Sequence, residues 1–241
     1  MKKVLMVIYS FPPLKNPGAE RAISFVKQLH HYGWEPLVLT HETGLSVSTE
    51  SGDQEPDGID IVRTRSWTTV NLPRPLRAAA NFFASCLLPD KERLWEQFSA
   101  RKAVRMVKNE GVDLVYTVSP PSSSHLIGLR LKKKYPRVPW VADLCALHTA
   151  GHLSPVKPSV LAPFSPSVKE HYEKKLLDKI ADRADCIVTG DEAVLQTFLT
   201  RQTDVNTENI ATLVSDGHVQ ELSELFEKAC RAIAARKLVN N

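Results

Sequence analysis

MKKVLMVIYSFPPLKNPGAERAISFVKQLHHYGWEPLVLT, residues 1–40, contains the pattern that decides the fold. Val4–Tyr9 is a short, uninterrupted apolar run, which predicts a parallel strand buried on both faces. Glu20–His31 carries apolar residues at helical spacing, Gly33 ends this helix, and Pro36–Thr40 is the next apolar run. The stretch therefore predicts a strand, a helix and a second strand in succession.

The same alternation continues along the chain. We expect further strands at Ile59–Arg63, Val112–Val118, Pro139–Ala142, Cys186–Thr189 and Ile210–Val214, and helices at Pro75–Leu88, Glu92–Asn109, Ser122–Tyr135, Ser167–Ala184, Glu192–Arg201 and Val219–Lys237. Such alternation predicts an α/β fold, a doubly wound, mostly parallel sheet with helices on both faces. Ligands of such sheets bind beyond the carboxyl ends of the strands, so function is expected in the loops that follow them.

Composition excludes several classes of protein. The 241 residues carry a net charge of +4, with 43% hydrophobic and 24% charged residues, which is typical of a globular protein and too mildly basic to indicate nucleic-acid binding. The apolar stretch Ala78–Leu88 is too short to span a bilayer. The first residues mimic a signal peptide, but Pro12-Pro13 stand where a cleavage site would be, which favours a buried strand. The four cysteines are far apart, which argues against a zinc site or a disulfide framework and suits the cytoplasm.

The first expected strand and helix are joined by a loop that suits an anion or a sugar hydroxyl. Pro17 and Gly18 allow a tight turn, and the free N–H groups of the helix start at Ala19–Glu20 face the ligand-binding edge. Gly18, Glu20 and Arg21 are candidate substrate-binding residues. Equally, Glu20 and Arg21 would serve only to cap and solvate the helix.

Two later loops carry further candidates. Ser119–Ser122 place hydroxyls beside the start of a helix, a donor-rich arrangement for hydroxyls or phosphate, although Ser122 also suits a simple N-cap. Asp143 and His148 follow the fifth strand, and His148 is a candidate catalytic base, against the alternative of polar surface. No metal site is expected.

A run of basic residues follows the second loop. Arg130–Lys134 and Arg137 form a positively charged patch, and residues 61–110 add an excess of basic residues with aromatic ones among them. Such a surface suits contact with anionic lipid, and a solvated helix end is the alternative.

Together these segments resemble the N-terminal domain of a family 4 glycosyltransferase of the GT-B fold. The resemblance rests on KVLMVIYSFPP, PGAERAISFVKQLHHYGWEPLVLT, LPDKERLW, DLVYTVSPPSSSHLIGLRLKKKY, VPWVADL, LLDKIADRADCIVTGDEAVLQTFL and NIATLVSDG, in this order. It implies a Rossmann-like, acceptor-side N-terminal domain at residues 1–217, followed by a C-terminal helix and polar tail at residues 218–241.

The resemblance implies transfer of a sugar from a nucleotide-sugar to a glycan or lipid-linked acceptor, in the synthesis of cell-surface polysaccharide. No cofactor is implied beyond the nucleotide-sugar donor. By position, Gly18, Glu20 and Arg21 match the first loop of the family's cleft, Ser119–Ser122 the second, and Asp143–His148 the third. We expect a cytoplasmic protein, at most peripheral to the inner face of the membrane, whose partners are the acceptor and a donor-domain chain.

Two departures from the family pattern are visible. After the fifth strand the family reads like D-x-R-D-x-W, whereas here Asp143 is followed by Leu144, Cys145, Ala146, Leu147 and His148, without the arginine, second acid and tryptophan. The donor-binding domain is not found in the sequence. Three hypotheses follow: an acceptor-binding half of a glycosyltransferase that is inactive alone, a degenerate non-catalytic binding module, and a small enzyme with other chemistry, the last without an identifiable nucleophile or metal cluster.

Overall fold

Seven short strands, rich in β-branched and apolar residues, form one sheet in the computed structural model of the chain. The structure describes residues 1–12, 17–42, 58–65, 93–144, 166–189, 196, 210–212 and 219–239. The strands are β1 (Lys2–Val7), β2 (Trp34–His41), β3 (Asp60–Thr64), β4 (Leu114–Val118), β5 (Trp140–Asp143), β6 (Cys186–Thr189) and β7 (Ile210–Thr212).

The strand order is β3-β2-β1-β4-β5-β6-β7, and every neighbouring pair is parallel. The register places Val4 of β1 opposite Pro36 of β2 on one side and Leu114 of β4 on the other. From β1 the chain adds strands first in one direction and then, from β4 onward, in the other. The order therefore reverses between β1 and β4, the place where ligands bind in doubly wound sheets.

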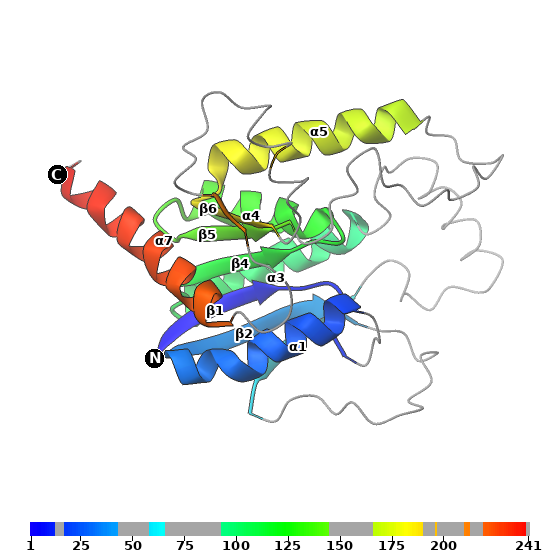
Figure 1. Cartoon of the computed structure of the whole chain (residues 1–241). Helices are drawn as coiled ribbons and strands as arrows, with labels where there is room; N and C mark the ends of the chain where they lie inside the picture. The colour runs from blue at the N-terminus through cyan, green and yellow to red at the C-terminus, as the bar shows by residue number, and fades with distance from the viewer. Residues whose placement is uncertain are drawn as a thin grey trace.

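The helices cover both faces of the sheet. They are α1 (Pro17–Leu29), α3 (Arg93–Asn109), α4 (Ser123–Lys134), α5 (Pro166–Arg183) and α7 (Val219–Val239), with a short 3-10 turn at His30–Tyr32. In Figure 1, α1 lies in front of the sheet and α3 and α4 lie behind it. The fold class predicted from the sequence, a doubly wound α/β sheet, is confirmed.

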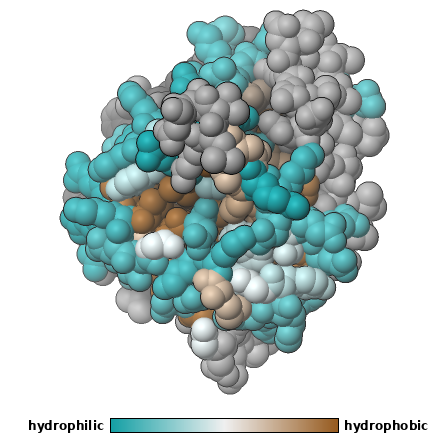
Figure 2. Space-filling model, turned by 90° about the vertical axis from the view of Figure 1, so that its left-hand side faces the viewer, coloured by the Kyte–Doolittle hydropathy of each residue, from teal (hydrophilic) through white to brown (hydrophobic). Residues whose placement is uncertain are grey.

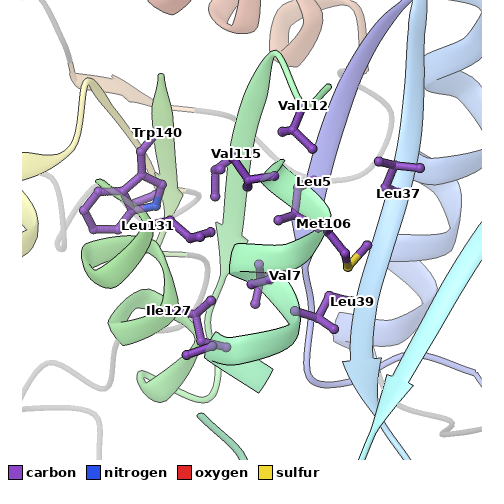
Figure 3. Packing of buried hydrophobic residues seen from close by; sticks show 14 of the residues in the cluster. Leu5, Val7, Leu37, Leu39, Met106, Val112, Val115, Ile127, Leu131 and Trp140 are labelled. Atoms are coloured by element: carbon purple, nitrogen blue, oxygen red, sulfur yellow. The ribbon is translucent and has the colours of Figure 1, made fainter. Parts of the chain in front are cut away.

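Two hydrophobic cores lie on the two faces, because alternate residues of each strand point to opposite sides. The first core joins side chains of β1, β2, β4 and β5 to those of α3 and α4, as Figure 3 shows for Leu5, Leu37, Met106, Val115 and Trp140. The second core joins the other strand faces to α1 and α7, and includes Val4, Met6, Phe25, Tyr116 and Phe226. Both faces of the sheet are thus covered by helices of the same chain.

The expected element bounds are confirmed to within a few residues wherever they fall on described residues, with one instructive difference. α1 begins at Pro17, three residues before the expected start, so Pro17 and Gly18 belong to the helix and not to a turn before it. Proline suits the first helical position because its fixed φ is helical and its missing N–H would be unpaired there anyway. The helices expected at Pro75–Leu88 and Glu192–Arg201 lie outside the described residues, except for Gln196, which is helical.

The buried carboxylate of Asp185 is hydrogen-bonded to three elements, β5, α4 and α7, at the amino edge of the sheet. Asp185, which is 4% exposed, accepts hydrogen bonds from the backbone N of Trp140 (2.8 Å), from Lys132 Nζ (2.5 Å) and from Arg236 Nη1 (3.3 Å). These donors belong to β5, α4 and α7. Figure 2 views this edge, at the left of Figure 1, and shows hydrophilic residues surrounding a small group of hydrophobic ones.

The apolar stripe of α7 packs on the sheet. Leu222, Phe226 and Ala229 are at most 2% exposed, and the ring of Phe226 makes edge contacts with Trp34 and Tyr116, with centroid distances of 5.3 Å to each. The stripe is therefore covered within this chain and is not an exposed docking face.

Candidate functional site

The loops that follow β1 and β4 leave the carboxyl edge of the sheet at the point where the strand order reverses. The loop after β1 leads into α1, which packs on one face, and the loop after β4 leads into α4, which packs on the other. Both helix starts therefore present backbone N–H groups near the same edge, an arrangement that favours anionic or hydroxyl ligands.

The loop after β4 is joined to the end of β5 through a single carbonyl group. The carbonyl oxygen of Asp143 accepts hydrogen bonds from the backbone N of Ser119 (3.0 Å) and from its Oγ (3.1 Å). Ser119 is 2% exposed, and both peptide bonds that follow it, to Pro120 and to Pro121, are cis. The structure thus brings Ser119 and Asp143 together. The Ser119 hydroxyl donates its hydrogen bond to the Asp143 carbonyl, which holds the ends of β4 and β5 together.

The side chain of Asp143 is fully buried at the carboxyl end of β5. The hydroxyl of Tyr116 donates a hydrogen bond to Asp143 Oδ2, from the neighbouring strand. A hydrogen bond to a carboxylate is stronger than one between neutral groups, and it fixes the direction of the carboxylate. The Asp143 side chain is therefore held in one direction at the carboxyl end of β5.

Ser122 stands at the N-cap position of α4, and no side-chain capping bond is formed there. Ser122 is half-buried, whereas Ser123 and Ser124 are fully buried. The simple capping role considered for Ser122 is therefore not what its hydroxyl does in this structure.

The candidates of the first loop lie in the first turns of α1. Glu20 is exposed and stands in the first turn, where a carboxylate is favoured by the helix dipole. Gly18 and Arg21 belong to the helix backbone. His148 lies outside the described residues, so its relation to the other candidates stays a prediction.

Reasoning from the sequence missed His41, the last residue of β2. Its Nδ1 lies 3.1 Å from the carbonyl oxygen of Tyr9, and the two rings stack with centroids 4.2 Å apart and planes 11° apart. Burial lowers the pKa of His41, opposed by the Tyr9 carbonyl and helped by the charge of Arg63. Since a carbonyl can only accept, Nδ1 carries the proton and Nε2 holds the free lone pair of the neutral ring.

This pair belongs to an aromatic group at the carboxyl edge. Trp95 of α3 meets the Tyr9 ring edge-on with centroids 5.2 Å apart, and Thr40 Oγ1 donates to the Tyr9 carbonyl at 3.0 Å. The signal that could have found it is the polar pair Thr40-His41, directly after an apolar strand. That strand was expected to stop at Thr40.

His125 is a second histidine that the sequence did not single out. It is fully buried in the first turns of α4, and its Nδ1 lies 2.8 Å from Thr117 Oγ1, which also accepts a hydrogen bond from Trp140 Nε1 at 2.9 Å. Burial lowers the pKa of His125 to about 3, so the ring is neutral at pH 7. Its Nε2 and the Oγ of Ser124 are buried polar atoms that find no hydrogen-bond partner among the described residues.

The described part of the chain offers oriented hydroxyl, imidazole and carboxylate groups at the carboxyl edge of the sheet. Metal-binding clusters and reactive thiols are two further kinds of site to consider. No group of three or more His, Cys, Asp or Glu that could hold a metal ion occurs among the described residues. Burial raises the pKa of Cys186 and of Cys230 to about 11, so neither thiol is a ready nucleophile. No described helix is both long enough and apolar enough to cross a membrane.

Comparison with known proteins gives structural likenesses only. No protein-family model matches the chain, and no curated protein matches it either. A form of sucrose-phosphate synthase from Thermosynechococcus elongatus is similar over 96% of this chain and 99% of its own, with a TM-score of 0.55 and 11% identity.

A second structure of sucrose-phosphate synthase from the same organism is similar over 90% of this chain, with a TM-score of 0.56 and 14% identity. This chain spans about half of that one, 49% of its length. A glycosyltransferase from Rickettsia africae has a TM-score of 0.45 and 16% identity, over 88% of this chain and 42% of its own. At such identities the two likenesses to sucrose-phosphate synthase show the fold alone, an α/β Rossmann-like domain.

Proposed function

We propose that the chain is the acceptor-binding half of a glycosyltransferase, which moves a sugar from a nucleotide-sugar to a glycan or lipid-linked acceptor in cell-surface polysaccharide synthesis. The nucleotide-sugar would be a substrate, and no further cofactor is invoked. The donor-binding half would come from a partner chain or from a further segment, and the reaction would take place in the cytoplasm.

The observation that carries the proposal is the joined end of β4 and β5. Asp143 is buried, oriented by Tyr116 and hydrogen-bonded to Ser119, and it lies at the carboxyl edge of the sheet, on the strand next to the β1–β4 pair where the strand order reverses. Buried polar groups that fix the orientation of a ligand are typical of small-molecule sites. The fold likeness to sucrose-phosphate synthase supports the same reading, because it extends over 96% of the chain.

A second candidate function is a binding module that catalyses nothing. The sequence after Asp143 favours it, since Cys145 and Ala146 stand where the resembled family has charge. The module would bind the same class of glycan and would gain no activity from a donor-domain partner.

Glycan binding by the purified chain tests the proposal. Titration of bacterial surface glycans followed by NMR should give saturable binding, weakened about tenfold in Glu20→Gln, because a charge-assisted hydrogen bond contributes about 1.5 kcal/mol or more. The matched control is Glu224→Gln, which removes the same charge from an exposed position of α7. Absence of binding, or equal losses in the two variants, would overturn the proposal.

Addition of a separate donor domain and nucleotide-sugar distinguishes the two candidates. Transfer of radiolabelled sugar to the bound glycan would support the transferase half. Binding without transfer, in the presence of a donor domain shown to bind nucleotide-sugar, would support the module.

A further inference from the structure

The outward side of α3 is basic over the second half of the helix. Arg101, Lys102, Arg105 and Lys108 are exposed and recur at helical spacing, on the side opposite Trp95, Ala103 and Met106, which pack on the sheet. None of these four cations has a carboxylate partner in the part of the chain that the structure describes.

The neighbouring helix α4 continues this charge. Its exposed residues Arg130, Lys133 and Lys134, with Arg137 just beyond, lie on the same side of the sheet as those of α3. The Arg130 Nε meets Glu96 Oε1 of α3 at 2.7 Å, which ties the two helices together. Glu96 is the partner of Arg130, and no salt bridge among the described residues joins the other exposed cations of the two helices to a carboxylate.

We name this surface the basic face, made up of Arg101, Lys102, Arg105, Lys108, Arg130, Lys133, Lys134 and Arg137. Elsewhere on the described surface several exposed cations have partners, such as Lys2 with Glu227 and Arg183 with Asp182. Paired charges cancel at a distance. Arg130 is paired with Glu96, so the positive potential of the basic face comes from its other seven cations, none of which forms a salt bridge with a described residue.

One large apolar side chain stands beside these cations. Phe98, one turn before Arg101 and Lys102, is 48% exposed, and among described residues only Met1 and Tyr32 are other large hydrophobic residues classed as exposed. A cationic helix surface with an exposed aromatic ring is the combination that binds lipid headgroups and inserts into their boundary with the acyl chains.

We propose that the basic face docks on an anionic lipid surface. Each lysine or arginine near such a surface contributes about 1 kcal/mol, so several together suffice for reversible binding, which salt weakens. A nucleic acid is the less favoured occupant, because Phe98 is a single exposed ring and offers no series of rings for base stacking. The proposal stands independently of the proposed function, since it requires no glycan and no sugar transfer.

Sedimentation with vesicles tests the proposal on the full chain. We expect binding to phosphatidylcholine vesicles that contain about 30 mol% phosphatidylglycerol, in about 0.1 M NaCl, and little binding to phosphatidylcholine alone. Arg101→Glu with Arg105→Glu should lower the partition coefficient about 30-fold or more, since it removes two contributions of about 1 kcal/mol each. Phe98→Ser should lower the residual binding at higher salt.

The matched control is Lys27→Glu with Arg231→Glu. Both positions are exposed on α1 and α7, on the other side of the sheet, and the change in net charge is the same. The control should bind within about twofold of the wild type, beyond which general electrostatics would account for the effect. Equal losses in the two double variants, absence of binding to anionic vesicles, or binding to duplex DNA without binding to vesicles would each overturn the proposal.

Discussion

The neutral ring of His125 makes the stability of the chain depend on pH. Burial lowers the pKa of His125 from 6.5 to about 3. Between these two values the histidine is protonated in the unfolded chain and neutral in the folded chain. The free energy of unfolding therefore falls as the pH falls through this range, by about 2 kcal/mol from this residue between pH 6.5 and pH 5. His41, whose pKa is also lowered, acts in the same direction.

Urea denaturation of His125→Gln at pH 7 and at pH 5 measures this contribution. The loss of stability on acidification should be smaller in the variant than in the wild type, by about 2 kcal/mol. His31→Gln, at an exposed histidine, should leave the loss unchanged. A pH dependence that is identical in all three proteins would contradict the prediction.

The hydrogen bond from the Tyr116 hydroxyl to Asp143 should also contribute to the stability of the folded chain. In Tyr116→Phe the buried carboxyl loses a donor while the ring still packs against Phe226, so we expect a loss of about 2 kcal/mol in the free energy of unfolding. Any glycan binding should weaken as well, because Asp143 would lose its fixed direction. Tyr32→Phe is the control, since Tyr32 is 41% exposed and should change stability by less than about 0.5 kcal/mol.

At the scale of elements, α4 packs closely against β5 at Gly128, where the helix backbone lies against the side chain of Trp140. A Cβ at Gly128 would overlap the indole of Trp140, which is 1% exposed and bonded to Thr117, so the ring has little freedom to move. Gly128→Ala should therefore destabilise the chain by about 1–3 kcal/mol, although the same change in an open helix adds about 1 kcal/mol. Thermal unfolding measures it, with Lys133→Ala at an exposed position of α4 as control, and a stabilised Gly128→Ala would show that the ring gives way.

The elements themselves could largely be predicted from local patterns. β6 follows from the apolar run at Cys186–Thr189, and the period of α3 from the spacing of its buried residues, since burial on a fixed face leaves a trace in the sequence. The site could be predicted only in part. The pairing of Ser119 with Asp143 needs the register of β4 with β5, and His125 reaches Thr117 only because α4 folds back on its own strand.

At the scale of the whole molecule, the proposed function gives the described residues one wall of a reaction site. The described residues of the carboxyl edge offer binding groups from one side, whereas transfer of a sugar needs both substrates held together and water excluded. We expect the purified 241 residues to show no transfer from any nucleotide-sugar to a bound glycan, measured with radiolabelled donor. Turnover that is abolished by Glu20→Gln and kept by Glu224→Gln would prove this expectation wrong.

The bonds of Asp185 bear on how the chain opens in solution. If α7 detached, this buried carboxylate would lose Arg236, and Phe226 would leave its place between Trp34 and Tyr116. Helix ends commonly fray and exchange their amide protons fast, whereas segments held by buried contacts exchange only when the core opens with them. The amides in the middle of α7 should therefore exchange with deuterium as slowly as those of β4 and β5, in one cooperative unit with the centre of the sheet.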